Sequence, residues 1–158
     1  MPAGADRTEI RDMRIVDTTI AVALAIACVP TTGCGDGRPQ RVPVSGQVLI
    51  DGKPLTMGGV RFTPASGRPS SGSIDSEGRF SLMTYEAGDG CTLGAHRVSV
   101  VSVDQVNSST RRWNAPKSYA SPETSGLAQT IEGPVDSLKI ELTWGNQKGP
   151  IVEKIYGE

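Results

Sequence analysis

The stretch HRVSVVSV, residues 96–103, carries the strongest strand pattern of the chain. Apolar and polar residues alternate up to Val100, which is the period of a half-buried β-strand. The alternation breaks at Val100-Val101, and this break predicts either a β-bulge or burial on both faces of the strand. The stretch therefore predicts a β protein in which residues 96–103 form a principal strand.

Six further stretches carry the same two-residue period or lie between clear turn signals. Asp51-Gly52-Lys53-Pro54 is a turn signal. Asp75-Ser76-Glu77-Gly78 is a hairpin turn with glycine where a positive φ is needed. Seven short strands with frequent turns predict an all-β fold, a seven-stranded Ig-like or transthyretin-like β-sandwich that follows an N-terminal signal segment. The six stretches are residues 42–50, 60–63, 72–75, 79–83, 126–132 and 138–144.

Two regions beyond these strands lack a clean period. Residues 104–122 are polar and are expected to form a loop on the surface, because a loop this long rarely fits inside a compact domain. Residues 145–158 are expected to form a loosely ordered tail. The sandwich domain is therefore placed at residues 44–144.

Composition and charge exclude several classes of protein. The chain has 158 residues, enough for one domain, and its 19 glycines and 11 prolines favour short strands and turns over long helices. Its 16 basic and 17 acidic residues give a net charge of −1, whereas a nucleic-acid-binding protein usually has a clear basic excess. We therefore expect no nucleic acid among its partners.

The N-terminal segment has the features of an export signal. Residues 20–29 read IAVALAIACV, ten apolar residues without a charge, whereas a membrane-spanning helix needs about 20. A run of this length suits the apolar region of a secretory signal. Met13-Arg14-Ile15 makes a more typical short positive start than Met1, so we expect translation to start at Met13.

The sequence Thr31-Thr32-Gly33-Cys34-Gly35 resembles the lipobox of bacterial lipoproteins. The resemblance implies cleavage before Cys34, attachment of diacylglycerol to its sulfur and acylation of the freed amine. Ala25-Ile26-Ala27-Cys28 is an alternative lipobox, or a site for ordinary signal peptidase, so lipidation at Cys28 and plain secretion remain open. With Cys34 as the anchor, residues 1–34 are the signal segment and residues 35–43 a Gly- and Pro-rich tether.

The order of motifs in the body resembles that of carboxypeptidase regulatory-like domains. The segments that carry the resemblance are Val44-Ser45-Gly46-Gln47-Val48, Asp51-Gly52-Lys53-Pro54-Leu55, Asp75-Ser76-Glu77-Gly78-Arg79-Phe80 and Leu93-Gly94-Ala95-His96-Arg97-Val98-Ser99-Val100. Such domains also occur alone in small bacterial lipoproteins. The resemblance covers residues 42–144 and implies a transthyretin-like (prealbumin-like) sandwich that is accessory and non-catalytic.

Residues suited to catalysis or to metal binding are scarce. His96 is the only histidine, whereas a catalytic zinc site needs three protein ligands and commonly several histidines. The acidic residues at Asp75, Glu77 and Asp89, with Asp51, suit turns better than a calcium site. Cys91, left without a partner once the signal is removed, is expected to be an inert buried thiol. We therefore predict no enzyme activity, no cofactor and no metal.

Aromatic and cationic residues in the 104–122 loop suggest one ligand site. Trp113 stands beside Arg111 and Arg112, and Tyr119 follows in the same loop, so an aromatic face is available to stack on a sugar ring. The alternative is a tryptophan that fixes the loop onto the sandwich. These four residues are the candidate contacts of a carbohydrate- or peptide-binding module.

Two functions follow from these observations. The first is a non-catalytic, exported lipoprotein that acts as a structural or interaction module of the cell envelope. It would be held by its lipid anchor on the periplasmic or outer face, and its partners would be the membrane and an envelope polysaccharide or protein. The alternative is the carbohydrate- or peptide-binding module that uses Trp113.

Overall fold

The computed structural model describes residues 37–155, and the structural statements below concern that part of the chain. The chain divides into two compact units, Met1–Arg38 and Pro39–Glu158, of which only the second is largely described. The predicted signal segment, with Met13, Cys28 and Cys34, lies outside the described residues. Within residues 37–155 no helix is long and apolar enough to cross a bilayer.

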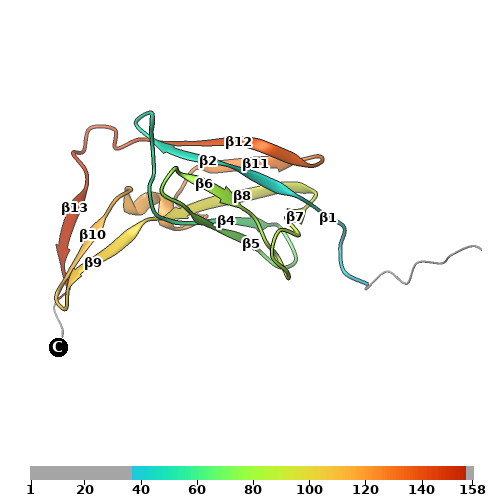
Figure 1. Cartoon of the computed structure of the whole chain (residues 1–158), viewed down its shortest axis with the longest axis horizontal. Coiled ribbons are helices and arrows are strands. Elements are labelled where there is room, and N and C mark those ends of the chain that lie inside the picture. The colour runs from blue at the N-terminus through green and yellow to red at the C-terminus, as the bar shows by residue number, and fades with distance from the viewer. Residues whose placement is uncertain (1–36, 156–158) are drawn as a thin grey trace, which may run out of the picture. The chain divides into compact units, whose positions relative to one another are not determined.

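Two principal sheets organise the described unit, which is all-β apart from one short 3-10 helix (Figure 1). In the first sheet, β2 lies between β12, with which it runs parallel, and the antiparallel strands β3 and β6. The second sheet is antiparallel in the order β11-β8-β4-β5. The bounds are β2 Val44–Ile50, β3 Lys53–Pro54, β6 Arg79–Ser81 and β12 Val135–Leu142 in the first sheet, and β4 Gly58–Pro64, β5 Ser70–Ile74, β8 Gly94–Val101 and β11 Leu127–Ile131 in the second.

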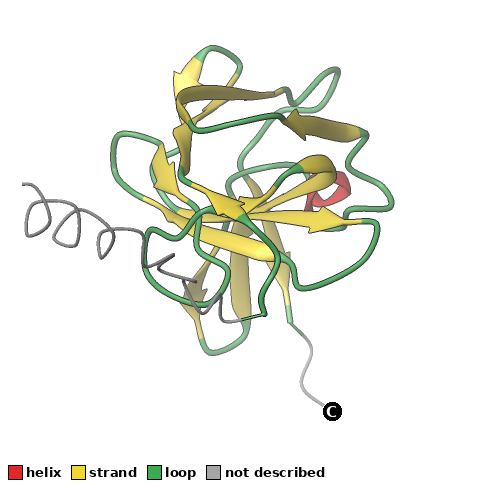
Figure 2. Ribbon diagram, turned by 90° about the vertical axis from the view of Figure 1, so that its right-hand side faces the viewer, coloured by secondary structure: helices red, strands yellow, loops and turns green. Residues whose placement is uncertain are grey.

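The apolar core lies between these two sheets, which form separate layers in the turned view (Figure 2). Phe62 from β4 and Phe80 from β6 meet in the core with ring centroids 6.4 Å apart. Both sheets supply the rest of the buried cluster, as expected for strands whose alternate side chains face inward. Other buried members are Val44, Val48, Val60, Ile74, Leu82, Val98, Val100, Ile131, Ile140 and Leu142.

Strand β8 tests the two explanations for the break in its alternation of apolar and polar residues. Its register with β4 runs without a shift through Val100 and Val101, so the strand has no bulge at that point. Val98, Ser99 and Val100 are all buried, so both faces are enclosed up to Val100, whereas Val101 at the break is 39% exposed. The chain leaves the strand at Ser102, whose hydroxyl donates to the carbonyl of Met57 at 2.6 Å.

A third sheet replaces the expected surface loop and part of the expected loose tail. Strands β9 (Val103–Asn107), β10 (Thr110–Trp113) and β13 (Ile151–Lys154) form an antiparallel sheet in the order β9-β10-β13. The two predictions are therefore wrong for these residues. The three strands carry mostly charged and polar side chains, so their sequences lack the apolar period that marks a core strand. A 3-10 helix η1, Lys117–Ala120, follows β10.

The folded unit begins earlier than the predicted boundary at residue 44. Strand β1, Arg41–Val42, pairs with β7, Cys91–Thr92, and the Val42 side chain is buried in the core. The carbonyl of Pro43 also accepts a hydrogen bond from the amide of Val135. The predicted tether is therefore too long at its C-terminal end, because its last residues contribute backbone pairing and apolar contact.

Each of the seven predicted stretches contains a strand, but the described residues hold thirteen strands in all. The predicted turn between β5 and β6 is present. The Asp75 carboxylate accepts from the amides of Glu77 and Arg79 at 2.8 Å each, and Gly78 has a φ of 77°. A side chain at Gly78 would also meet the carbonyl of Val48 at 2.7 Å, so both conformation and space require glycine here.

Candidate functional site

Trp113 ends strand β10 in the third sheet, opposite Ile151 of β13. Its side chain is half-buried, and its indole N–H donates to Oε2 of Glu153 at 3.1 Å. The Arg111 guanidinium lies 5.4 Å from the ring centroid and the Lys117 ammonium 5.3 Å from it. Cations at this distance interact favourably with an aromatic ring. Trp113 is therefore already engaged by the protein's own charged groups.

Glu153 of β13 holds this cluster together. Its Oε2 also accepts from Nε of Arg111 at 2.9 Å, and its Oε1 pairs with Nζ of Lys117 at 2.6 Å. The hydrogen bonds from Lys117, Arg111 and Trp113, in that order of size, lower the pKa of the Glu153 carboxyl to about 2. The arrangement is an ion-pair network of one carboxylate and two cations that fixes β13 and η1 to β10.

Arg112 is not part of the Glu153 cluster. It follows Arg111 in a strand, where neighbouring side chains point to opposite faces of the sheet. Its guanidinium donates two hydrogen bonds to Asp104 of β9, at 2.7 and 3.2 Å. Hydrogen bonds from Arg112 and Asn114 lower the pKa of the Asp104 carboxyl. The hydrogen bond with Asp104 in turn raises the pKa of Arg112. Arg112 thus stabilises the pairing of β9 with β10.

Tyr119, the fourth predicted contact, belongs to η1 and packs partly against the core. Its hydroxyl oxygen accepts from the backbone amide of Thr143 at 3.3 Å. The structure therefore brings Trp113 and Arg111 together and places Arg112 and Tyr119 elsewhere. Lys117 and Glu153 complete the cluster. The sequence analysis did not single out Lys117 within residues 104–122, and it missed Glu153 because residue 153 was assigned to a loose tail.

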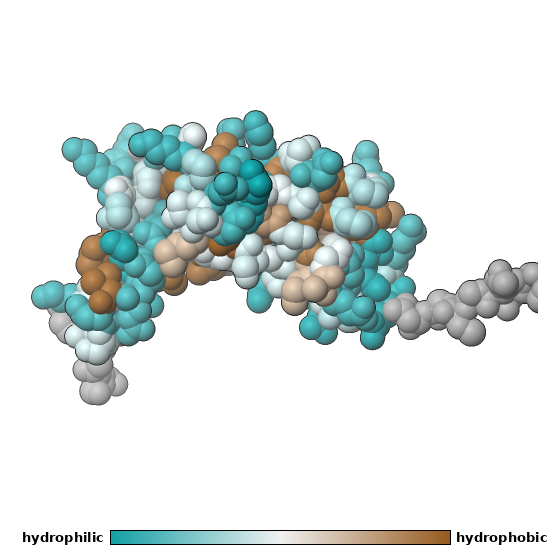
Figure 3. All heavy atoms as spheres, viewed as in Figure 1, coloured by the Kyte–Doolittle hydropathy of each residue, from teal (hydrophilic) through white to brown (hydrophobic). Residues whose placement is uncertain are grey.

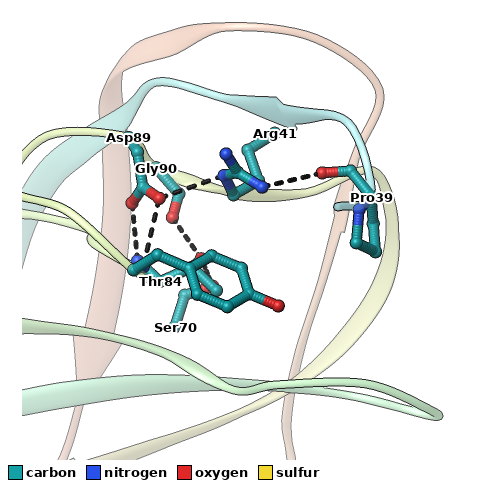
Figure 4. A network of polar contacts seen from close by, with 7 residues as sticks. Pro39, Arg41, Ser70, Thr84, Asp89 and Gly90 are labelled. Atoms are coloured by element: carbon teal, nitrogen blue, oxygen red, sulfur yellow. Dashed lines mark hydrogen bonds and ion pairs between the residues drawn. The ribbon is translucent and has the colours of Figure 1, made fainter. Parts of the chain in front are cut away.

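A second group of polar contacts lies beside β1 (Figure 4). The Asp89 carboxylate accepts from the backbone amides of Thr84 at 2.6 Å and Tyr85 at 3.1 Å, and it pairs with Nε of Arg41 at 3.0 Å. Burial by itself raises the pKa of Asp89. Three backbone hydrogen bonds and the charge of Arg41 more than offset that effect, so the pKa lies below its ordinary value.

A shallow cleft of about 350 Å³ opens next to this network. Its wall is formed by Pro39, the loop of residues 64–68, Tyr85 and the turn of residues 92–95. Arg68 is the one charged side chain among the lining residues, and its guanidinium lies 5.1 Å from the centroid of the Tyr85 ring. No sequence motif pointed to this cleft, because its residues come from four separate segments.

No family model, curated protein or solved structure matches this chain. Its candidate sites are therefore judged on their own geometry. Of the two, the Glu153 cluster has its carboxylate bonded to Arg111, Trp113 and Lys117. The cleft beside Pro39 presents the exposed Arg68, and the Tyr85 ring there lies beside Arg68 and Arg41, 5.1 and 4.9 Å from its centroid.

His96 and Cys91 are both enclosed within the fold. His96 is 2% exposed, and its Nε2 lies 2.8 Å from the carbonyl oxygen of Thr92. The centroids of the His96 and Phe62 rings are 5.9 Å apart. Cys91 is fully buried, and burial raises the pKa of its thiol to about 11. A thiol of this kind is mostly protonated at neutral pH, so it is a poor nucleophile.

The acidic residues considered for a calcium site do not converge. Asp75 binds the backbone of its own turn, Asp89 binds backbone amides and Arg41, and Asp51 accepts from the hydroxyl of Thr143 at 2.8 Å. Across residues 37–155 no group of three potential metal-binding side chains comes together. The turn interpretation of Asp75 agrees with its hydrogen bonds.

Proposed function

We propose that the chain is an exported, lipid-anchored and non-catalytic β-sandwich protein that acts as a structural or interaction module of the cell envelope. Cys34 supplies the anchor in this proposal. The lipobox-like sequence and the ten-residue apolar run before it support export and lipidation. Two or more acyl chains on one cysteine would hold the protein stably on a membrane, whereas one chain binds only marginally.

The start of the folded unit carries the proposal. Pro39 follows Cys34 by five positions, and β1 is already paired with β7 at Arg41. A lipidated Cys34 would therefore lead almost directly into a folded β domain, which is how a small anchored module is built. The remaining tether, residues 35–38, is long enough to separate the anchor from the fold and too short to add a further element.

The finer fold assignment belongs to the same proposal. We assign the two principal sheets to the transthyretin-like sandwich of carboxypeptidase regulatory-like domains. The resembling motifs support this assignment, because they fall on β2, on the turn between β5 and β6 and on β8. In large carboxypeptidases these domains are accessory, which favours a non-catalytic role. The enclosure of His96 points the same way, because a substrate cannot reach a ring that is 2% exposed.

Mass spectrometry of the mature N-terminus tests the anchor. We expect a chain that begins at Cys34 and carries diacylglycerol on its sulfur, and we expect Cys34→Ser to abolish both processing and membrane retention. Cys28→Ser is the matched control, which should be processed as the wild type is. An unmodified N-terminus, or a chain that begins at Cys28, would contradict the proposal.

A peptide-binding role of the third sheet is the second candidate function. Among the described strands, β9 and β13 each pair only with β10, so each presents an open edge to which an extended peptide can add. Val106 and Val152 are 51% and 61% exposed on these strands, and apolar surface near β13 is visible in Figure 3. Because Arg111 and Lys117 already lie over the Trp113 ring, peptide binding is favoured over sugar stacking in this alternative.

Binding assays distinguish peptide binding from sugar binding by the third sheet. Titration with extended peptides should show binding that Val152→Asp weakens, whereas binding of a polysaccharide that is lost in Trp113→Ala would favour the sugar platform. Met83→Asp, an exposed position outside this sheet, serves as the control. An absence of binding to either class of ligand would leave the anchored structural role.

A further inference from the structure

The cleft beside Pro39 lies at the end of the sandwich from which the chain leads back to Cys34. Pro39 lines the cleft itself. Five residues of fully extended chain span at most about 18 Å, so a lipidated Cys34 keeps this cleft within that distance of the membrane surface. The opposite end of β8, at Val101, lies about 25 Å farther along the strand, because β8 has eight residues. With the axis of β8 perpendicular to the membrane, that end is therefore outside the reach of the tether.

The chemistry of the cleft suits the headgroup region of a phospholipid bilayer. Arg68 is exposed and is the one charged residue among those that line the cleft. The Asp89 carboxylate nearby is already engaged by backbone amides and by Arg41, so it does not compete with an incoming anion for Arg68. A guanidinium binds a phosphate through paired hydrogen bonds.

Apolar and aromatic residues at the rim add a second feature. Leu93, in the turn between β7 and β8, is 43% exposed although it is a large apolar residue. Pro39, Pro64 and the ring of Tyr85 line the same cleft. Aromatic rings and cationic side chains are enriched where proteins meet the boundary between lipid and water.

We propose that this end of the sandwich docks on the membrane that carries the anchor, with Arg68 on a phospholipid phosphate and Leu93 inserted at headgroup depth. The proposal rests on the proposed lipidation of Cys34 and adds an orientation to it. Acidic residues such as Glu86 and Glu132 lie in neighbouring loops, so docking depends on the phosphate contact and on Leu93 rather than on a net positive face. The β9-β10-β13 sheet would then point away from the membrane.

A fluorescent label at the rim tests the orientation. The processed lipoprotein carrying Leu93→Cys is labelled with an environment-sensitive dye and reconstituted in vesicles of phosphatidylethanolamine and phosphatidylglycerol with nitroxide-labelled headgroups. Cys91 will not compete for the dye, because it is fully buried and its pKa is raised to about 11. We expect strong quenching of the dye at position 93 and at a second site in the cleft, Ser66→Cys. A dye at Val152→Cys, in the third sheet, should remain unquenched.

Charge variants test the phosphate contact. Because a single cation near a lipid surface contributes about 1 kcal/mol, Arg68→Ala should lower the ratio of docked to undocked domain about fivefold. Lys53→Ala removes an exposed cation next to the opposite end of β2 and should leave the quenching at position 93 unchanged.

The outcomes of this experiment separate the two proposals. A protein that does not float with the vesicles overturns the anchor and the docking together. A protein that floats, but is quenched equally at positions 93 and 152, overturns the docking and leaves the anchor intact. Quenching at position 93 that is insensitive to Arg68→Ala removes the phosphate contact from the proposal.

Discussion

The two-sheet sandwich and the third sheet are built from different forces. The sandwich encloses a continuous apolar cluster to which both of its sheets contribute. The β9-β10-β13 sheet has no such cluster, and its strands are joined by ion pairs of Arg111, Arg112 and Lys117 with two carboxylates. Apolar burial is the dominant stabilising force in folding, whereas exposed ion pairs contribute little each. The sandwich should therefore set the global stability, and the third sheet should open locally without unfolding it.

The largest expected effect is the loss of Phe62 from the sandwich. Phe62 is fully buried and contacts the rings of Phe80 and His96, so Phe62→Ala should lower the free energy of unfolding by about 3–5 kcal/mol. Urea unfolding followed by circular dichroism measures this change. Val152→Ala, an exposed position of the third sheet, should stay within about 0.5 kcal/mol of the wild type. Equal losses of unfolding free energy in both variants would contradict the proposed difference between the sandwich and the third sheet.

A smaller effect is expected from a buried hydroxyl of the sandwich. The Thr84 hydroxyl donates to the carbonyl of Gly90 at 2.7 Å and lies 2.7 Å from the hydroxyl of Ser70 (Figure 4). Thr84→Val leaves buried partners unsatisfied and should cost about 1–3 kcal/mol of unfolding free energy in the same assay. Thr143→Val removes an exposed hydroxyl that bonds Asp51 and should change little. A neutral result for Thr84→Val would mean that water reaches the Ser70 site.

Glu153→Gln should act on the third sheet alone. The substitution keeps the shape of the side chain and removes the charge that pairs with Arg111 and Lys117. We expect amide hydrogen exchange in β13 to become about tenfold faster, because local opening no longer has to break the ion pairs. Exchange in β4 and β8 should not change. Glu141→Gln on β12 is the control, and faster exchange throughout the domain would contradict independent opening.

The smallest effect is the response of the Glu153 cluster to pH. The pKa of Glu153 is lowered from 4.5 to about 2 in the folded protein, so its ionised form is favoured by folding. The stabilisation it supplies is complete above pH 4.5 and is lost as the pH falls from 4.5 through about 2. An NMR titration of the Glu153 carboxyl carbon measures this midpoint. Lys117→Met should move the midpoint upward, and a wild-type midpoint near 4.5 would show that the cluster does not form in solution.

The same contrast explains how much of the fold could be predicted from the sequence. Core strands such as β2, β8 and β12 alternate apolar and polar residues, and the turn at Asp75 carries its own hydrogen-bonding chemistry. These signals are local, so they can be read without a structure. Strands β10 and β13 are separated by about forty residues in the sequence and are joined through charged side chains. A local apolar period does not predict such pairing.

The candidate site was predictable only in part for a related reason. Trp113 and Arg111 were identified because they are close in sequence, and they do lie together. Glu153 comes from a distant segment, Lys117 was overlooked although it lies four positions after Trp113, and the cleft at Pro39 combines four separate segments. Arg112 and Tyr119 were grouped with Trp113 by proximity along the chain, although strand geometry and η1 direct them elsewhere. Nearness in sequence is thus a poor guide to which side chains share a surface.

The parallel pairing of β2 with β12 has a consequence for how the protein matures. Strand β2 is nearly the first element of the folded unit and β12 the last of the sandwich, so that Ser45 and Asp136, which are bonded across this pair, lie 91 positions apart. If the chain is exported as proposed, β2 leaves the membrane channel well before β12, its partner in the sheet. Contacts this distant in sequence slow folding, because the long intervening loop must close first. The sandwich can form only once nearly the whole chain is available, so the proposed export would carry a chain that is still unfolded.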